Sequence, residues 1–171
     1  DLRGFSAMAE RLAPEQVVRV INNYLGTMAD VILAHDGTID EFIGDSVLGF
    51  FGAPVARPDD ARRAVACALA MQKGMERVNR RNADEGLPSV EMGIAVHTGD
   101  VVVGNIGSEK RAKYGAVGSH VVAGVEGGRR DPGRDATGCG LREDQSGPDE
   151  SVPAGRADLA ACRRDQLQRY R

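Results

Sequence analysis

Apolar residues recur at spacings of three and four between Pro14 and about Ala34, which is the pattern of one face of an amphipathic helix. The residues of this face are Val17, Ile21, Tyr24, Met28 and Val31. A second helical stretch begins at Pro58–Asp60, where acidic residues suit the helix dipole, and ends before Gly86. Its apolar positions are Ala61, Val65, Ala68, Leu69, Met75 and Val78. The pattern therefore predicts two long helices, each with one buried face.

Short runs of β-prone residues lie between and after these helices. Thr38–Ile43 and Val47–Phe51 are joined by Gly44-Asp45-Ser46, and a tight glycine-containing turn between such runs predicts a β-hairpin with Asp45 near its tip. Three more strands and a short helix, at about residues 7–12, complete the prediction. The strands are Val90–His97, Asp100–Ile106 and Lys113–Val117, with a turn at Thr98-Gly99 between the first two.

The predicted order of the main elements is helix, hairpin, helix, hairpin and strand, and we expect a first strand before Asp1. This order predicts an α+β fold of ferredoxin-like kind, in which helices pack on one face of an antiparallel sheet.

The composition of the chain changes at about Ala123. Residues 123–171 contain no Lys, Ile, Phe or Met and are rich in Gly, Arg, Asp and Pro. We therefore expect one domain at 1–122 and an atypical tail at 123–171 that is disordered or encoded in a shifted reading frame. Within this tail, only Ala157–Tyr170 has the spacing of a marginal helix.

Composition limits the classes of partner and compartment. A chain of 171 residues with a net charge of −3 gives no electrostatic reason to expect nucleic acid or a membrane surface as a partner. Cys67 falls on the apolar side of the second helix as a buried free thiol, which favours a reducing, cytoplasmic location. The chain opens on Asp1 with no leader, so we read it as part of a longer protein in which sensor or membrane domains could lie upstream.

Two aspartates, Asp1 and Asp45, stand in glycine-bearing turns. Each alone has an ordinary explanation, because aspartate caps helices and tolerates turn dihedrals. Together, one at a strand end and one at a hairpin tip, they can meet on adjacent strands and bind a divalent metal that also takes oxygens from a triphosphate. Backbone amides for the phosphates are expected just before the short helix, at Gly4, Phe5 and Ser6.

The other polar residues give weaker indications of function than the two aspartates do. His97, on an alternating strand, is expected to be a packed structural histidine, and Arg3 to be solvated or near phosphate. Lys110, Arg111 and Lys113 are expected to form a charged loop near an interface or a solvated face.

Four sequence motifs follow one another along residues 1–122. They are Asp1–Ser6, Phe42–Asp45 with Phe50–Pro54, Gly93–Gly99 with Val103–Gly107, and Lys113–Val121. In this order they resemble the opening motif, the second motif, the central hairpin and the strand into the last catalytic helix of the bacterial class III nucleotidyl cyclases.

The resemblance implies a palm-like domain that works as a homodimer, with active sites between the two chains. One chain would supply Asp1, Asp45 and the backbone carbonyl of Leu2 to two Mg²⁺ or Mn²⁺ ions, with Gly44 beside the substrate. The implied reaction is attack by the ribose 3′-hydroxyl of a nucleoside triphosphate on its α-phosphorus, which releases pyrophosphate and leaves the 3′,5′-cyclic monophosphate.

Glu41 and Gly115 fall on the family's two base-selecting positions. Adenylyl cyclases of the family usually carry lysine at the first and aspartate or threonine at the second. A carboxylate can instead accept hydrogen bonds from both N1–H and the 2-amino group of guanine, and a glycine leaves room for a different base. We therefore favour GTP over ATP as the substrate, with an adenylyl cyclase on the same scaffold as the alternative. An exposed strand glutamate and a glycine at a bulge are the plainer interpretations of the two residues.

Two positions depart from the family pattern. Directly after the Val121 position the family has an asparagine, and four residues later an arginine, which orient the ribose and stabilise the pentavalent phosphorus. Here Val122 and Glu126 stand at these positions, and a late phosphate-binding lysine of the family has no match in the tail. These departures favour a second alternative, a catalytically inactive cyclase-homology module that binds nucleotide or only dimerises.

Overall fold

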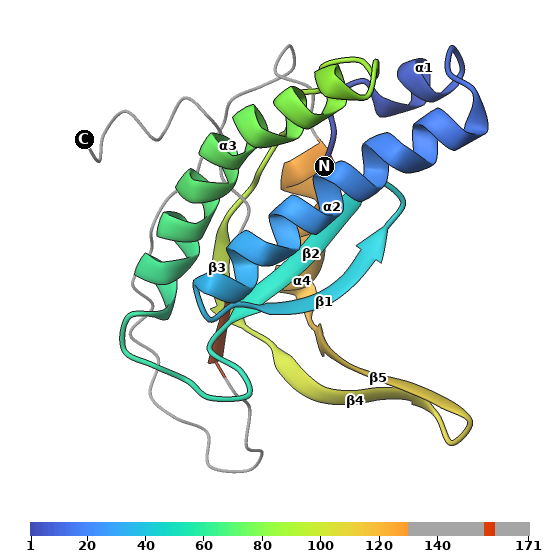
Figure 1. Cartoon of the computed structure of the whole chain (residues 1–171). Coiled ribbons are helices and arrows are strands. Elements are labelled where there is room, and N and C mark those ends of the chain that lie inside the picture. The colour runs from blue at the N-terminus through green and yellow to red at the C-terminus, as the bar shows by residue number, and fades with distance from the viewer. Residues whose placement is uncertain (130–155, 160–171) are drawn as a thin grey trace, which may run out of the picture.

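Two long helices, α2 (Pro14–Ala34) and α3 (Asp60–Asp84), lie side by side over one face of an antiparallel sheet (Figure 1). The structure is a computed structural model that describes residues 1–129 and 156–159. The remaining elements are α1 (Phe5–Ala9), β1 (Thr38–Ile43), β2 (Ser46–Phe51), β3 (His97–Asp100), β4 (Val102–Ser108), β5 (Arg111–Val117), α4 (Ser119–Arg129) and β6 (Arg156–Leu159). The predicted α+β class with antiparallel strands is confirmed.

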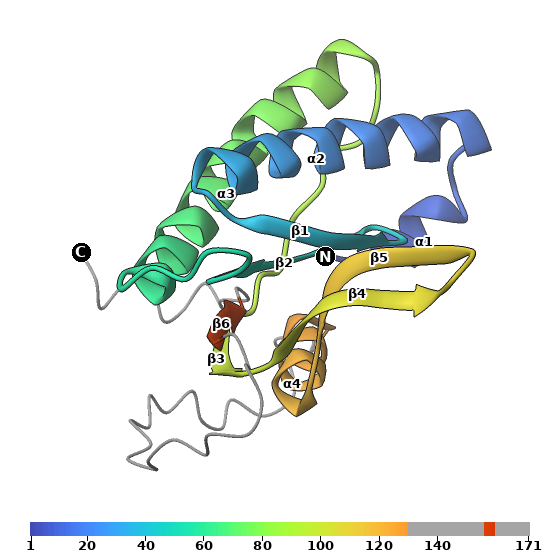
Figure 2. The ribbon, with the colours of Figure 1, turned by 90° about the horizontal axis from the view of Figure 1, so that it is seen from below.

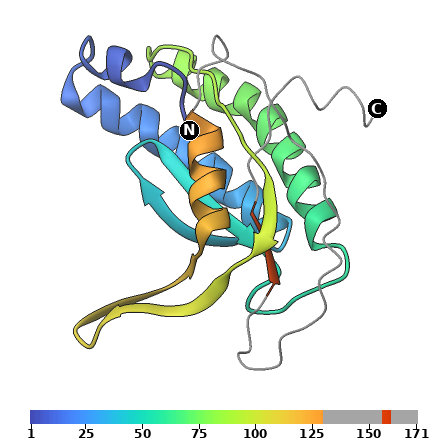
Figure 3. The ribbon, with the colours of Figure 1, turned by 180° about the vertical axis from the view of Figure 1, so that it is seen from behind.

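The strands form two sheets. The first has the order β1-β2-β6-β3, and the second is the β4-β5 hairpin, which projects from the body of the domain (Figures 1 and 2). Strands β1 and β2 form the predicted hairpin, with Thr38 opposite Phe50 and Ile43 opposite Ser46. Helix α4 lies against β3 on the side of the sheet away from α2 and α3 (Figures 2 and 3).

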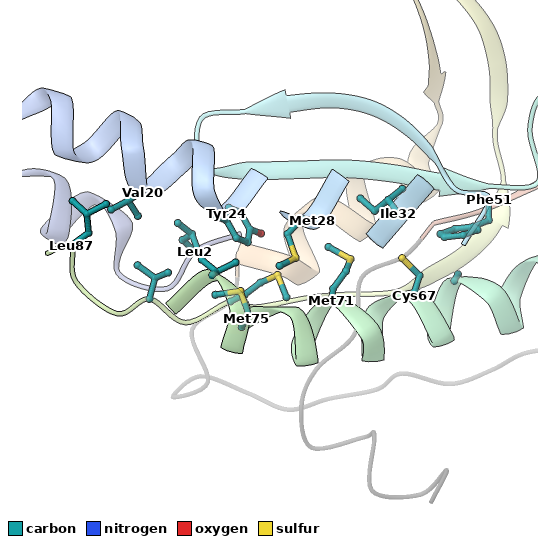
Figure 4. Packing of buried hydrophobic residues seen from close by; sticks show 14 residues of the cluster. Leu2, Val20, Tyr24, Met28, Ile32, Phe51, Cys67, Met71, Met75 and Leu87 are labelled. Atoms are coloured by element: carbon teal, nitrogen blue, oxygen red, sulfur yellow. The ribbon is translucent and has the colours of Figure 1, made fainter. Parts of the chain in front are cut away.

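The core lies between the two long helices and the sheet, where methionines of both helices meet (Figure 4). The predicted face of α2 is confirmed at Tyr24 and Met28, which are fully buried. The predicted face of α3 is confirmed at Ala68, Met75 and Val78, which are buried, and is wrong at Ala61, which is exposed. Apolar spacing also omitted Asn82, a polar residue that is buried on this face.

Polar groups inside the core are paired. Asn82 accepts a hydrogen bond of 3.0 Å from Asn23 of α2, so a buried amide pair ties the middle of α2 to the C-terminal end of α3. Cys67 is a buried free thiol, as predicted, and burial raises its pKa to about 11.

The predicted strand Val90–His97 is wrong over most of its length. Within it, Met92 forms an isolated bridge with Leu2, and only His97 belongs to a strand, β3. At its start a side chain of α3 replaces a strand partner: Asn79 bonds both the N–H and the carbonyl of Val90, at 2.8 and 3.0 Å. A turn at Thr98-Gly99 is also wrong, because both residues lie inside β3, which pairs with β6.

Several boundaries differ from those expected. Helix α4 runs from Ser119 to Arg129 and so extends beyond residue 122. The marginal helix expected at Ala157–Tyr170 is wrong at its start, because residues 157–159 belong to β6, where ladders to β2 and β3 outweigh a weak helical preference. The rest of that segment lies outside the described residues. Helix α1 begins at Phe5, two residues before the predicted start.

Candidate active site

The N-terminal segment and the β1-β2 turn bring Asp1 and Asp45 together, as the sequence predicted. The backbone N–H of Leu2 donates a hydrogen bond of 3.1 Å to Asp45 Oδ2, and the hydroxyl of Ser46 donates one of 3.0 Å to Asp1 Oδ1. Each carboxylate thus accepts a hydrogen bond from a neutral group of the residue that follows the other aspartate in the sequence. The arrangement leaves two negative charges side by side.

The core fixes the segment that carries Asp1. Leu2 is 4% exposed and belongs to the main hydrophobic cluster. The backbone nitrogen of Asp1 donates to the hydroxyl of Tyr24 at 3.2 Å, and the carbonyl of Asp1 accepts from Gly93 N–H at 2.9 Å. Burial, and secondly the negative charge of Asp45, raise the pKa of the Tyr24 hydroxyl, which therefore stays protonated.

Two glycines shape the turns on either side of the carboxylates. Gly4 and Gly44 have φ values of 64° and 63°, in the left-handed region that favours glycine. Gly44 closes the hairpin directly before Asp45, and Gly4 directly precedes α1. Because α1 contains only five residues, its dipole is small, and phosphate binding by the amides of Gly4, Phe5 and Ser6 stays a prediction.

The donor atoms around Asp1 and Asp45 suit a hard divalent cation. Two carboxylates and the backbone carbonyl of Leu2 are oxygen ligands, which Mg²⁺ and Mn²⁺ prefer. In the described part of the chain, no three His, Cys, Asp or Glu side chains gather into a metal-binding group. An ion at this pair would therefore need further oxygens from water or from a phosphate.

A second group of charged residues surrounds the other two predicted residues, Glu41 and Gly115. Lys113 of β5 forms ion pairs with Asp40 Oδ1 at 2.8 Å and with Glu41 Oε1 at 2.9 Å. The carboxylate of Asp40 also accepts a hydrogen bond of 3.3 Å from Ala116 N–H. Gly115 is buried beside this carboxylate, whereas Glu41 is exposed. The structure thus brings Glu41 and Gly115 into one neighbourhood, where strands β1 and β5 meet.

Sequence reasoning missed Asp40 and the role of Lys113. Lys113 was predicted to begin a strand, which β5 confirms, but it was also grouped with Lys110 and Arg111 in a charged loop or solvated face, and its pairing with two carboxylates was missed. The available signal was the pair of consecutive acids in a predicted strand, because alternation would send one of them inward, where a partner is required.

His97 packs against a second histidine, in agreement with a structural role. Its Nε2 lies 2.8 Å from Nδ1 of His120 at the start of α4, and the two rings stack at a centroid distance of 5.0 Å. Burial, and secondly the charge of His120, lower the pKa of His97. Val122, which stands where the family has asparagine, is 57% exposed on α4.

The sequence matches the family model described as the adenylate and guanylate cyclase catalytic domain over residues 1–124. It is 37% identical over 142 residues to adenylate cyclase 1 of Rhizobium meliloti, covering 82% of this chain and 21% of that protein. It is 32% identical over 127 residues to an adenylate cyclase of Anabaena cylindrica, covering 71% of this chain and 24% of that protein. The chain thus spans about a fifth to a quarter of the length of these relatives.

Solved structures resemble the fold as well. The guanylyl cyclase Cya2 is 55% identical, with a TM-score of 0.73 over 75% of this chain and 65% of that one. The adenylyl cyclase CyaB of P. aeruginosa is 29% identical, with a TM-score of 0.69 over 96% of this chain and 92% of that one. Within residues 1–129 and 156–159, no helix has the length and apolar character needed to cross a bilayer. The chain therefore belongs to the adenylate and guanylate cyclase catalytic domain family, the class III nucleotidyl cyclases.

Proposed function

We propose that this chain is the catalytic domain of a guanylyl cyclase, which converts GTP to cyclic GMP and pyrophosphate. The observation that carries the proposal is the joint position of Asp1 and Asp45, each held by a hydrogen bond beside the other. The 55% identity to the guanylyl cyclase Cya2 supports GTP as the substrate. The adenylate cyclases among the relatives support ATP as the competing candidate.

Asp1, Asp45 and the carbonyl of Leu2 would hold the metal ions. When bound, Mg²⁺ or Mn²⁺ would lower the pKa of the ribose 3′-hydroxyl and offset the charge of the triphosphate. The protein's own part is to fix the carboxylates: the Leu2 N–H and the Ser46 hydroxyl restrain their orientation before substrate arrives. Gly4, Phe5, Ser6 and Gly44 would lie along the phosphates.

Glu41 would select the base. Its side chain is 43% exposed, so it can reach a ligand, and its two oxygens can accept hydrogen bonds from N1–H and the 2-amino group of guanine. Gly115 would stand at the second base-selecting position, where the space left by its missing side chain is taken by the carboxylate of Asp40.

The two groups of residues would act in a homodimer. Asp1 and Asp45 of one chain would meet Glu41 and Gly115 of its partner across the interface. Large apolar side chains are exposed on β1, on the β4-β5 hairpin and on α4, where a second chain would cover them. They are Phe42, Ile43, Val102, Tyr114, Val117 and Val122. In the longer parent protein, upstream domains would regulate this domain in the cytoplasm.

The proposal is tested by measuring cyclic nucleotide formed from GTP and from ATP with Mn²⁺, on this chain and on Asp45→Ala. We expect product from GTP, little from ATP, and none from either with Asp45→Ala. Product from ATP alone would end the argument from Glu41.

A catalytically inactive module is the second candidate, and Val122 and Glu126 favour it. The family's asparagine and arginine at these positions stabilise the transition state, and loss of one such group commonly costs roughly a hundredfold or more in rate. In that case the chain binds GTP with Mn²⁺ but forms no product. The double substitution Val122→Asn, Glu126→Arg separates the candidates: it should raise the turnover of a weakened cyclase and should give no product in a non-catalytic module.

A further inference from the structure

Strand β1 contains a β-bulge at Asp40. Ile39 lies opposite Gly49 and Glu41 opposite Leu48, so Asp40 is an extra residue without a partner on β2. In a regular strand, two consecutive side chains point to opposite faces. Here the bulge lets both Asp40 and Glu41 reach the same ammonium group, that of Lys113.

Asp40 is buried although it carries a charge. Its side chain is 2% exposed, and its partners are the ammonium of Lys113 and the N–H of Ala116. A buried carboxylate requires such partners, and removing one of them is costly. The carboxylate of Asp40 also lies close to Gly115, because a Cβ added at Gly115 would lie 2.5 Å from Asp40 Oδ1. Asp40 therefore joins β1 of the first sheet to β5 of the second.

Glu41 and Lys113 are placed differently from Asp40. Their side chains are 43% and 42% exposed, so both can meet a ligand. An exposed ion pair alone is held weakly, because both side chains rotate freely in water. The contact with buried Asp40 removes much of this freedom from the ammonium of Lys113, and Lys113 in turn contacts one oxygen of Glu41. Hydrogen bonds to Asp40, and secondly to Glu41, raise the pKa of Lys113, so the ammonium stays charged.

We propose that Asp40 is a positioning residue for base selection: it fixes Lys113, and through Lys113 it fixes the carboxylate of Glu41 that reads the purine. This inference rests on the proposed function, in which Glu41 contacts the base. Two parallel hydrogen bonds to guanine require the carboxylate in one plane with the base edge. A lysine bound to one lone pair of Oε1 restricts rotation of the carboxylate and leaves Oε2 and the second lone pair of Oε1 to the ligand.

The test is equilibrium binding of GTP and of ATP, each with Mn²⁺, to the full chain and to Asp40→Asn. Asparagine keeps the shape and can still accept from Ala116 N–H, but it loses the charge that holds Lys113. We expect GTP affinity to fall roughly threefold to tenfold, as for one weakened charge-assisted hydrogen bond, and ATP affinity to stay unchanged. In a chain that turns over, the loss should appear in KM for GTP with kcat unchanged.

Matched variants separate positioning from general damage. Asp36→Asn removes a carboxylate from the exposed ion pair with Arg57 and should change neither affinity. Lys113→Met should reproduce the loss seen with Asp40→Asn, Lys113→Arg should largely retain GTP affinity, and Asp40→Asn added to Lys113→Met should cause no further loss. Comparison of Lys113→Met with Lys113→Arg also tests the inference if Asp40→Asn does not fold.

Two outcomes overturn the inference but leave the proposed function standing: equal loss of GTP and ATP affinity in Asp40→Asn, or additive losses of GTP affinity from Asp40→Asn and Lys113→Met. A wild-type chain that binds neither nucleotide would overturn the proposed function, and this inference with it. Failure of the inference alone is therefore distinct from failure of the proposed function.

Discussion

The middle of β1 and the turn that follows this strand carry acidic residues of different character. At the turn, Asp45 and Asp1 accept hydrogen bonds from neutral groups, the Leu2 N–H and the Ser46 hydroxyl. At the bulge, Asp40 and Glu41 share the ammonium of Lys113. Neutral donors orient a carboxylate without cancelling its charge, so the turn suits a bound cation. At the bulge the ammonium of Lys113 offsets one of the two negative charges, so this group suits recognition of a base by directional hydrogen bonds.

The largest expected effect comes from removing charge at the turn. Asp45→Asn can still accept from Leu2 N–H but offers a poorer ligand to a divalent ion, so Mn²⁺-dependent turnover of GTP should fall roughly a thousandfold. Cyclic nucleotide formation measures this, with Asp36→Asn as the matched control. A loss smaller than about tenfold would mean that the turn does not hold the metal, and the contrast between the turn and the bulge would fail.

Reversing charge at the bulge should change selectivity rather than turnover. Glu41→Lys reverses the exposed charge and keeps Lys113 on the buried carboxylate of Asp40, which needs that partner. This variant should lower the preference for GTP over ATP by roughly tenfold to a hundredfold, because a lysine donates where guanine also donates. Competition binding of the two nucleotides gives this ratio, and an unchanged ratio would exclude Glu41 as the selecting residue.

A smaller effect is expected on stability at the bulge. In Gly115→Ala the new Cβ would lie 2.5 Å from Asp40 Oδ1, which must move away from its partners, at a cost of about 1–2 kcal/mol. Gly26→Ala in α2 is the control, because its Cβ would meet nothing within 4 Å and alanine favours the helix. Urea unfolding should show the first variant destabilised and the second stabilised; equal shifts would contradict the close packing of Asp40.

The smallest effect concerns the pH dependence of stability, and it involves His97 on β3 rather than a residue of β1 or its turn. Burial and His120 lower the pKa of His97 below its usual 6.5, so the unfolded chain binds this proton at a higher pH than the folded chain does. The contribution of neutral His97 to stability is therefore complete above about pH 6.5 and declines as the pH falls below it. His97→Gln should reduce the decline in urea midpoint between about pH 7.5 and about pH 5.5; an identical decline would refute this role.

The sequence predicted best those features that rest on local, repeated signals. Tyr24 and Met28 were assigned to the core because the spacing of α2 persists over 21 residues. The tip position of Asp45 followed from Gly44. Val90 was wrongly assigned to a strand because its backbone bonds the side chain of Asn79, a contact that produces no periodic pattern in the sequence.

The residues around Glu41 and Gly115 show a second limit of prediction from the sequence. Glu41 and Gly115 were predicted by resemblance, yet nothing in the alternating pattern indicated that Asp40 is the extra residue of a bulge. A bulge depends on how two strands pair, and Lys113 reaches Asp40 from a strand far along the chain. Such long-range contacts determine the site's electrostatics, and a single sequence does not display them.

The bulge at Asp40 also allows the middle of β1 to change during evolution independently of the turn that follows the strand. Because the extra residue has no partner on β2, its deletion would leave Ile39 opposite Gly49 and Glu41 opposite Leu48, and the ladder as far as Ser46 would keep its register. A lineage could therefore gain or lose this residue, and with it the anchor for Lys113, without moving the aspartate at the turn. Substrate choice could diversify along one strand while the chemistry at its tip stayed the same.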